Sequence, residues 1–204
     1  MNLIDRLYAK EIPAIVISEH GEMSELLPVK PLVLSGSFNP LHNGHREMLS
    51  VASGLTGKIG YYEISIQNVD KVPLPRKALG KRAEQIADEG KSLIVTNAAH
   101  FTEKSTIVPG ADFVIGFDTL VRLLDKKYYV DHVRVTNSPV YDSLNLISQN
   151  GCRFVVAGRI DSSLEFKEFI HSSAPTEFQN MFIGLSESQF RSDISSTELR
   201  DRII

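Results

Sequence analysis

The segment PLVLSGSFNPLHNGH, residues 31–45, contains a strand, a sharp turn and the first turn of a helix in immediate succession. Its opening PLVLSG is a short apolar run bounded by a turn, which is typical of a buried strand. Gly36 lets the backbone turn sharply at a place where a side chain would block a ligand. Asn43 is a favourable N-cap, so we expect a helix to start beside it. A strand followed by a helix is the repeating unit of an α/β fold.

The same unit recurs along most of the chain. Near-continuous apolar runs, as in parallel strands covered on both faces, predict further strands at residues 59–66, 92–97, 111–116, 153–158 and 181–184. Helical spacing of apolar residues between these runs predicts buried helix faces, the first of them formed by Met48, Val51, Ala52 and Leu55. We therefore expect a doubly wound, Rossmann-like parallel sheet of the α/β class, with ligands bound beyond the carboxyl ends of its strands.

The length of the chain favours one domain. A protein of 204 residues buries about 70% of the surface that its unfolded chain exposes, which allows one substantial core. We expect this single domain to span residues 31–204. Residues 1–30 precede the alternation and are interpreted as an N-terminal arm that adds one edge strand at residues 15–17.

Composition excludes several classes of protein. No apolar stretch approaches the roughly 20 residues of a membrane span, and the N-terminus lacks the basic start and cleavage site of a signal peptide. Cys152 is the single cysteine, which rules out an internal disulfide and favours a reducing compartment. A net charge of −3 argues against a nucleic-acid-binding protein. We expect a cytoplasmic protein with small-molecule partners, without membrane or nucleic-acid partners, and the sequence leaves a homo-oligomer open.

His42 and His45 lie three residues apart at the expected helix start. The first amides of a helix point outward unpaired and attract anions, so both imidazoles can face a bound phosphate. Ordinary loop chemistry is one alternative to this phosphate site. A metal site is another, but it requires a third or fourth ligand, and Cys152 lies more than a hundred residues away.

A second candidate phosphate site is ISSTELR, close to the C-terminus. Ser195 followed three residues later by Glu198 forms a capping box, which predicts a helix start. Ser196 and Arg200 then share one helix face with Thr197 beside them, so hydroxyls, amides and a guanidinium can clamp phosphate. The alternative is a well-capped terminal helix with an exposed arginine.

These two segments resemble the GxFxPxHxGH and ISSTxxR signatures of the nucleotidylyltransferase superfamily, whose members transfer NMP from an NTP. The residues that match the fixed positions of the first signature are Gly36, Phe38, Pro40, His42, Gly44 and His45. The two signatures occur in the family's order, and the resemblance covers about residues 32–202. It implies an in-line attack of an acceptor phosphate or phosphorylated alcohol on the α-phosphorus of the nucleotide, with release of pyrophosphate.

The resemblance also implies roles for individual residues. His45 is expected at the α-phosphate, His42 at the triphosphate, and Arg200 at the β- and γ-phosphates, these three being the catalytic set. Mg²⁺ is expected to be held mainly by the nucleotide phosphates, with no metal ligands from the protein. The further nucleotide-binding residues that the two signatures imply are Gly36, Ser37, Phe38, Gly44, Ser195, Ser196 and Thr197.

Two internal segments resemble the nicotinamide and nicotinate mononucleotide adenylyltransferases. ADFVIGFD, residues 111–118, is similar to their strand-plus-GxD segment, which implies that Asp118 binds a nucleotide ribose. The alternative is that Asp118 only caps a helix beginning at Thr119. The strand at residues 153–158 ends in Gly-Arg as theirs does, which implies that Arg159 contacts nucleotide phosphate or base, the alternative being an ordinary surface arginine.

The acceptor site is less clearly defined by sequence. Lys71 follows the second strand and is expected to meet the acceptor's phosphate. The chain has no Trp to stack on a pyridine ring, and its possible substitutes are Phe101, Phe117, Tyr128 and Tyr129. The expected reaction is transfer of AMP from ATP to nicotinamide or nicotinate mononucleotide. The alternatives are cytidylyl or adenylyl transfer to a different phosphorylated acceptor, and a non-catalytic nucleotide-binding regulatory module.

Overall fold

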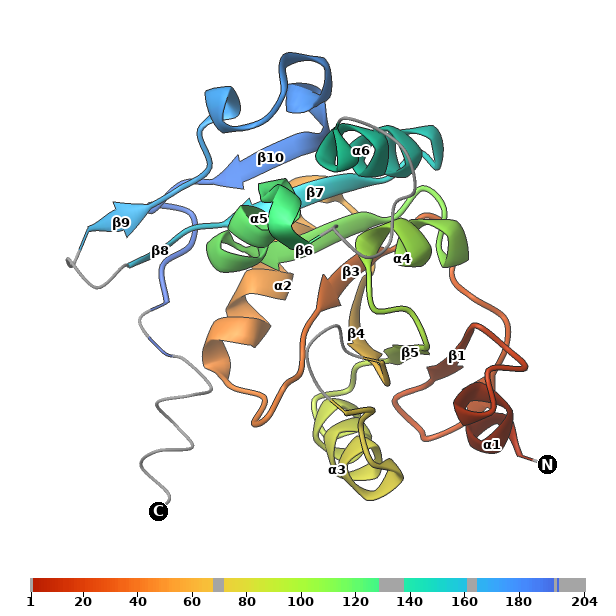
Figure 1. Ribbon diagram of the computed structural model, residues 1–204. Helices are drawn as coiled ribbons and strands as arrows, with labels where there is room; N and C mark the ends of the chain where they lie inside the picture. Colours follow the sequence, from red (N-terminus) through yellow and green to blue (C-terminus); the bar gives the residue numbers. More distant parts are fainter. Residues whose placement is uncertain (1, 68–71, 129–137, 161–164, 193, 195–204) are drawn as a thin grey trace.

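The computed structural model describes residues 2–67, 72–128, 138–160, 165–192 and 194, which form a three-layer α/β fold (Figure 1). The central sheet has eight strands. In spatial order they are β10 (Phe182–Leu185), β7 (Arg153–Ala157), β6 (Asp112–Gly116), β3 (Leu32–Ser35), β4 (Gly60–Ser65), β5 (Leu93–Thr96), β1 (Ala14–Ile17) and β2 (Met23–Ser24). The strands from β10 to β5 are parallel, and β1 and β2 are antiparallel to their neighbours. The predicted doubly wound, Rossmann-like sheet is confirmed.

Helices cover both faces of this sheet. One face carries α1 (Leu3–Tyr8), α2 (Asn43–Thr56) and α3 (Arg76–Ala87), and the other carries α4 (Phe101–Ile107), α5 (Phe117–Leu124) and α6 (Pro139–Gln149). Each predicted strand is present because its apolar run is buried between the two helical layers. Short 3₁₀ helices and a separate two-stranded ribbon complete the fold, namely η1 (Lys126–Tyr128), η2 (His171–Ser173), η3 (Thr176–Met181), β8 (Arg159–Ile160) and β9 (Phe166–Lys167).

The buried face of α2 differs in part from the predicted one. Leu49 and Ala52 are buried, Met48 and Val51 are partly buried, and Leu55 is 45% exposed. Leu55 lies to one side of the helix face that Leu49 and Ala52 form, so its side chain is turned toward solvent. None of the helices in the described ranges is long and apolar enough to serve as a membrane span.

The order of the strands places the carboxyl ends of β3 and β6 at a topological switch point. From β3 the chain proceeds outward through β4 and β5, then returns to β6 on the other side of β3. Crossover helices on opposite faces leave a crevice above the carboxyl ends of these two strands. The loop after β3, which carries the first signature, lies at this crevice.

The N-terminal segment is packed into the same sheet. The strand expected at residues 15–17 is present within β1, which pairs with β5, but β2 lies outside it and forms the edge. Leu7 and Ile15 are fully buried in the core under this face. The Tyr8 hydroxyl donates to the Leu74 carbonyl at 2.7 Å. Residues 2–30 therefore extend the fold rather than stand apart from it.

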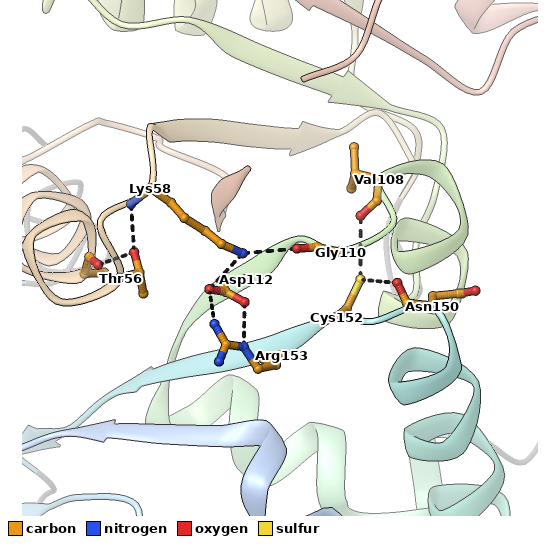
Figure 2. A network of polar contacts seen from close by, with 9 residues as sticks. Thr56, Lys58, Val108, Gly110, Asp112, Asn150, Cys152 and Arg153 are labelled. Carbon is orange, nitrogen blue, oxygen red and sulfur yellow. Dashed lines mark hydrogen bonds and ion pairs between the residues drawn. The ribbon is translucent and has the colours of Figure 1, made fainter. Parts of the chain in front are cut away.

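A buried carboxylate ties together the opposite, amino ends of the strands (Figure 2). Asp112 on β6 accepts hydrogen bonds from Arg153 Nε at 3.0 Å and Nη2 at 2.8 Å, and pairs with Lys58 Nζ at 3.0 Å. Lys58 Nζ also donates to the Gly110 carbonyl at 3.1 Å. Burial opposes ionisation of Asp112, but the bonds from Arg153 and Lys58 outweigh it and lower the pKa of this carboxyl.

We expect Asp112→Asn to lower the free energy of unfolding by about 1–3 kcal/mol at pH 7, because Arg153 and Lys58 lose the buried negative charge and one of its two acceptor oxygens. The lowered pKa of Asp112 stabilises the fold above the ordinary aspartate pKa, near 4, and this stabilisation disappears as the pH falls through the folded-state pKa. Urea titrations at pH 7 and pH 3 test both statements. The exposed Asp88→Asn is the control and should change stability by less than about 0.5 kcal/mol. Equal losses in the two variants would contradict the structural role of Asp112.

Candidate functional site

The loop after β3 leads into α2 through His42. His42 has extended backbone angles (φ −142°, ψ 170°) and is the N-cap, so the expectation that Asn43 caps this helix was wrong. The Asn43 side chain instead accepts a hydrogen bond from Arg46 Nη1 at 2.7 Å. The His42 N–H donates to His45 Nδ1 at 3.4 Å. The imidazole of His45 therefore accepts a hydrogen bond from one of the backbone amides that have no partner within the helix.

The two histidine rings are stacked at this helix start. Their centroids are 3.7 Å apart and their planes are inclined by 25°. The edge-on ring of Phe38 supports His45 at a centroid distance of 5.0 Å, and Phe38 contacts Tyr62 in the same manner at 5.0 Å. Phe38 is 1% exposed, so its side chain is part of the core rather than a surface for ligand.

Gly36 is required by the way Phe38 folds back. The backbone of Phe38 is left-handed (φ 45°), and a Cβ at Gly36 would lie 2.8 Å from the Phe38 ring. Real Cβ atoms essentially never approach a neighbour so closely. Gly36 therefore permits the tight loop that holds Phe38 beneath His45.

Burial favours the neutral form of both histidines at pH 7. Burial, followed by the nearby His42 and Arg46, lowers the pKa of His45 to about 3. Burial and Arg46 also lower the pKa of His42. Since Nδ1 of His45 accepts the His42 N–H, the proton of neutral His45 resides on Nε2, which is a hydrogen-bond donor. The Nδ1 atom of His42 is buried and has no partner among the described residues.

Gly44 brings the far end of the chain to this helix start. A Cβ at Gly44 would collide with the Ser192 hydroxyl and lie 3.2 Å from the His42 ring. Ser192 follows β10, and the chain runs from β10 down beside α2 (Figure 1). The segment that leads into the second signature thus contacts the first signature.

Several predicted site residues lie outside the described residues. They are Lys71, Tyr129, Ser195, Ser196, Thr197 and Arg200.

Asp118 and Arg159 come together at the carboxyl ends of β6 and β7. Helix α5 begins at Phe117 with Gly116 as its N-cap, so Asp118 is its second residue and the capping alternative was wrong. The Asp118 carboxylate forms an ion pair with the Arg159 guanidinium, which lies at the start of β8. Their side chains are 63% and 49% exposed. Two residues predicted separately thus form one exposed pair.

A cavity of about 660 Å³ opens at the carboxyl ends of β3 and β4, a size typical of small-molecule sites. Its walls come from the loop after β3, the residues after β4, and the helices α3 to α6. The lining residues from the loop and from α4 and α5 are Ser35, Gly36, Ser37, Asn39, Phe101, Thr102, Lys104, Thr119, Arg122 and Leu123. Of the aromatic residues considered above, Phe101 lines this cavity, whereas Phe117 packs against the core.

Lys104 is a cavity residue that sequence reasoning missed. It lies on α4, which buries Lys104 and Ser105 beside the partly buried Phe101 and Ile107. These polar residues interrupt the apolar pattern of the helix, so in the sequence Lys104 resembles an ordinary surface lysine. Within the described ranges, no group of three or more His, Cys, Asp or Glu side chains lies close enough to hold a metal ion.

Comparisons with known proteins agree with this arrangement. The profile of the Cytidylyltransferase-like family matches residues 33–202. A putative nicotinamide mononucleotide adenylyltransferase of Schizosaccharomyces pombe is 32% identical over 144 residues, which cover 63% of this chain and 54% of that protein. A probable nicotinate-nucleotide adenylyltransferase of Gloeobacter violaceus is 27% identical over 185 residues, or 84% of this chain and 82% of that protein. The chain spans about half the length of the first relative and most of the second.

The lowered pKa of His45 predicts a specific dependence of stability on pH. Between pH 6.5 and 3 the unfolded chain takes up a proton that folded His45 does not, so the folded state loses stability as the pH falls. This loss in the free energy of unfolding amounts to at most about 1.4 kcal/mol for each pH unit below 6.5. His45→Gln has no titrating imidazole at this position, so the variant should not show the loss. Denaturant titrations of both proteins at pH 7, 6 and 5 measure the difference.

The control is His20→Gln, since the His20 side chain is 78% exposed. That variant should keep the pH dependence of the parent protein. If His45→Gln also keeps it, His45 is not held neutral by its surroundings.

Proposed function

This chain belongs to the cytidylyltransferase-like family, and on that premise we propose that it transfers AMP from ATP to a phosphorylated acceptor with release of pyrophosphate. The proposed acceptor is nicotinamide or nicotinate mononucleotide, the nucleotides that appear in the names of the two relatives. Nucleotidyl transfer is supported by the family, and the choice of AMP and of the acceptor goes beyond it.

The observation that carries the proposal is the position of one loop between two sites. Residues 36–39 line the cavity with Gly36, Ser37 and Asn39, and the same loop continues into the stacked histidines at the start of α2. A triphosphate at the helix start and an acceptor in the cavity would meet across this loop. Such juxtaposition is what an in-line displacement between two bound substrates requires.

In the proposed reaction, a phosphate oxygen of the acceptor attacks the α-phosphorus of ATP. The new bond joins this oxygen to the α-phosphorus, and the bond between the α-phosphorus and the bridging oxygen of the β-phosphate breaks, releasing pyrophosphate. The nucleophile is already anionic, so no strong general base is required. Catalysis then depends on positioning and on stabilising charge at the phosphoryl oxygens.

His45 is well placed for that stabilisation. Its neutral ring presents Nε2–H as a donor, and Phe38 and His42 fix the orientation of the ring, so no reorganisation is needed during the reaction. His42, with a buried and unpartnered Nδ1, is proposed to contact the triphosphate. The nucleotide would bind as its Mg²⁺ complex, with the ion coordinated by phosphates and water.

The remaining predicted residues keep their proposed roles. Asp118 and Arg159, at the carboxyl ends of β6 and β7, are proposed to contact the ribose and the phosphate or base of the nucleotide. Arg200, with Ser195, Ser196 and Thr197, is proposed for the β- and γ-phosphates, supported by the contact between Ser192 and the first signature. Lys71 is proposed for the acceptor phosphate.

The proposal is tested by measuring pyrophosphate release with ATP or CTP and a panel of phosphorylated acceptors. We expect turnover with ATP and a pyridine mononucleotide. Turnover with CTP, or with a different acceptor, would assign another transfer reaction to the same site. Nucleotide binding without pyrophosphate release from any pair would identify a regulatory module instead.

We expect His45→Ala to lower kcat by about 10²–10³-fold, the usual cost of losing one preorganised donor, while the affinity for nucleotide changes far less. Steady-state kinetics and calorimetric titration with ATP measure the two effects separately. His171→Ala, at an exposed position in η2, is the control and should behave as the parent protein. A His45→Ala protein with unaltered turnover would remove this residue from the mechanism.

A further inference from the structure

The cavity contains a buried charged pair that the proposed reaction does not use. Glu63 on β4 is 1% exposed and Lys104 on α4 is 7% exposed. Lys104 Nζ donates to Glu63 Oε2 at 2.7 Å, and the buried hydroxyl of Thr96 donates to Glu63 Oε1 at 2.7 Å. Glu63 thus has a partner on each oxygen, and the pair is held rigidly between the sheet and α4.

Lys104 is the member of this group that lines the cavity. Its Nζ lies 5.1 Å from the centre of the Phe101 ring, which also lines the cavity and is anchored in the core against Phe113 and Phe154. An ammonium group carries three donors, and Glu63 accepts one of them. Lys104 can therefore donate a further hydrogen bond to a molecule in the cavity.

The charge of Lys104 is already balanced by Glu63. A neutral carbonyl oxygen can accept a hydrogen bond from Lys104 and leave this balance unchanged. A carboxylate at the same place would put two anions around one cation in a desolvated site, where an uncompensated charge is costly. The other titratable side chains that line the cavity, Arg82, His100 and Arg122, each have interactions of their own within the protein.

The elements that line the cavity suggest how an acceptor is oriented. Ser37 and Asn39 belong to the loop that continues into the stacked histidines, whereas Lys104 and Phe101 come from α4 and Leu123 from α5. The acceptor phosphate belongs beside the loop, where the transfer would occur. The ring of the acceptor, with its polar substituent, then extends toward α4.

We propose that Lys104, held by Glu63, is a specificity-determining residue that selects an acceptor whose ring carries a neutral carboxamide over one that carries a carboxylate. This inference rests on the proposed function, because it takes the cavity as the acceptor site. The names of the two relatives differ in this substituent, nicotinamide in one and nicotinate in the other.

Calorimetric titration of the full chain with nicotinamide mononucleotide and with nicotinate mononucleotide tests the proposal. We expect the parent protein to bind the amide at least about 10-fold more tightly, the effect of one hydrogen bond to a charged donor. Glu63→Gln leaves the Lys104 charge unbalanced, so the ratio of the two affinities should shift toward the carboxylate by about 10-fold or more. The double variant Glu63→Gln with Lys104→Met removes both charges and should bind the amide about 10-fold more weakly than the parent does.

Asp112→Asn is the matched control, because it removes a buried carboxylate from an ion pair at the opposite end of the strands. It should leave the ratio unchanged, and circular dichroism verifies that each variant is folded. The double variant carries the test if Glu63→Gln alone does not fold. The proposal is overturned if the parent prefers the carboxylate or binds neither nucleotide, or if the folded variants keep the parent ratio.

Pyrophosphate release, measured on the same samples, separates this inference from the proposed function. If the preference for the amide depends on Glu63 but ATP and CTP release no pyrophosphate, the proposed reaction is wrong and the role of Lys104 is retained. If pyrophosphate is released but both acceptors bind equally well, the proposed reaction is retained and the role of Lys104 is wrong.

Discussion

The contact between the Phe38 ring and the backbone of Gly36 determines the shape of the site. The ring folds back over the glycine, packs edge-on against Tyr62 in the core and supports His45 from below. His45 in turn stacks on His42 and accepts its N–H. A continuous series of ring contacts therefore runs from the core, through Phe38, to the two histidines of the candidate site. The orientation of both histidine rings is thus fixed by contacts with each other and with the buried ring of Phe38.

Charge is buried at both ends of the parallel strands, with different consequences. At the amino ends, Asp112 joins β6 to Arg153 of β7 and to Lys58 (Figure 2), and none of these three residues lines the cavity. At the carboxyl ends, Glu63 and Lys104 form a pair of which one member lines the cavity. The group around Asp112 connects elements of the fold, whereas the pair formed by Glu63 and Lys104 lies at the wall of the cavity.

The sequence predicted the sheet well because its strands are continuous apolar runs, and burial on both faces leaves little alternative to them. The N-cap of α2 was assigned wrongly to Asn43 because Asn is a good N-cap in general. The N-cap is His42, whose backbone N–H donates to the imidazole of His45. Lys104 was missed because it lies beside other polar residues on α4 and resembles a surface lysine in the sequence. The presence of both histidines in the first signature was evident from the sequence, but their stacking and their neutral state depend on Phe38 and on burial, which sequence alone does not reveal.

The N-terminal segment has a consequence for the boundaries of the folding unit. The family match begins at residue 33, yet β1 pairs with the full length of β5, and Asn97, directly after β5, donates to the Ile12 carbonyl at 3.0 Å. A chain trimmed to the family match would expose the apolar strand β5 as a bare edge, open to pairing with other molecules. It would also loosen Thr96, the last residue of β5, which holds Glu63. Residues 2–30 therefore cover an edge of the sheet that the family match leaves open, and they support the strand that holds Glu63.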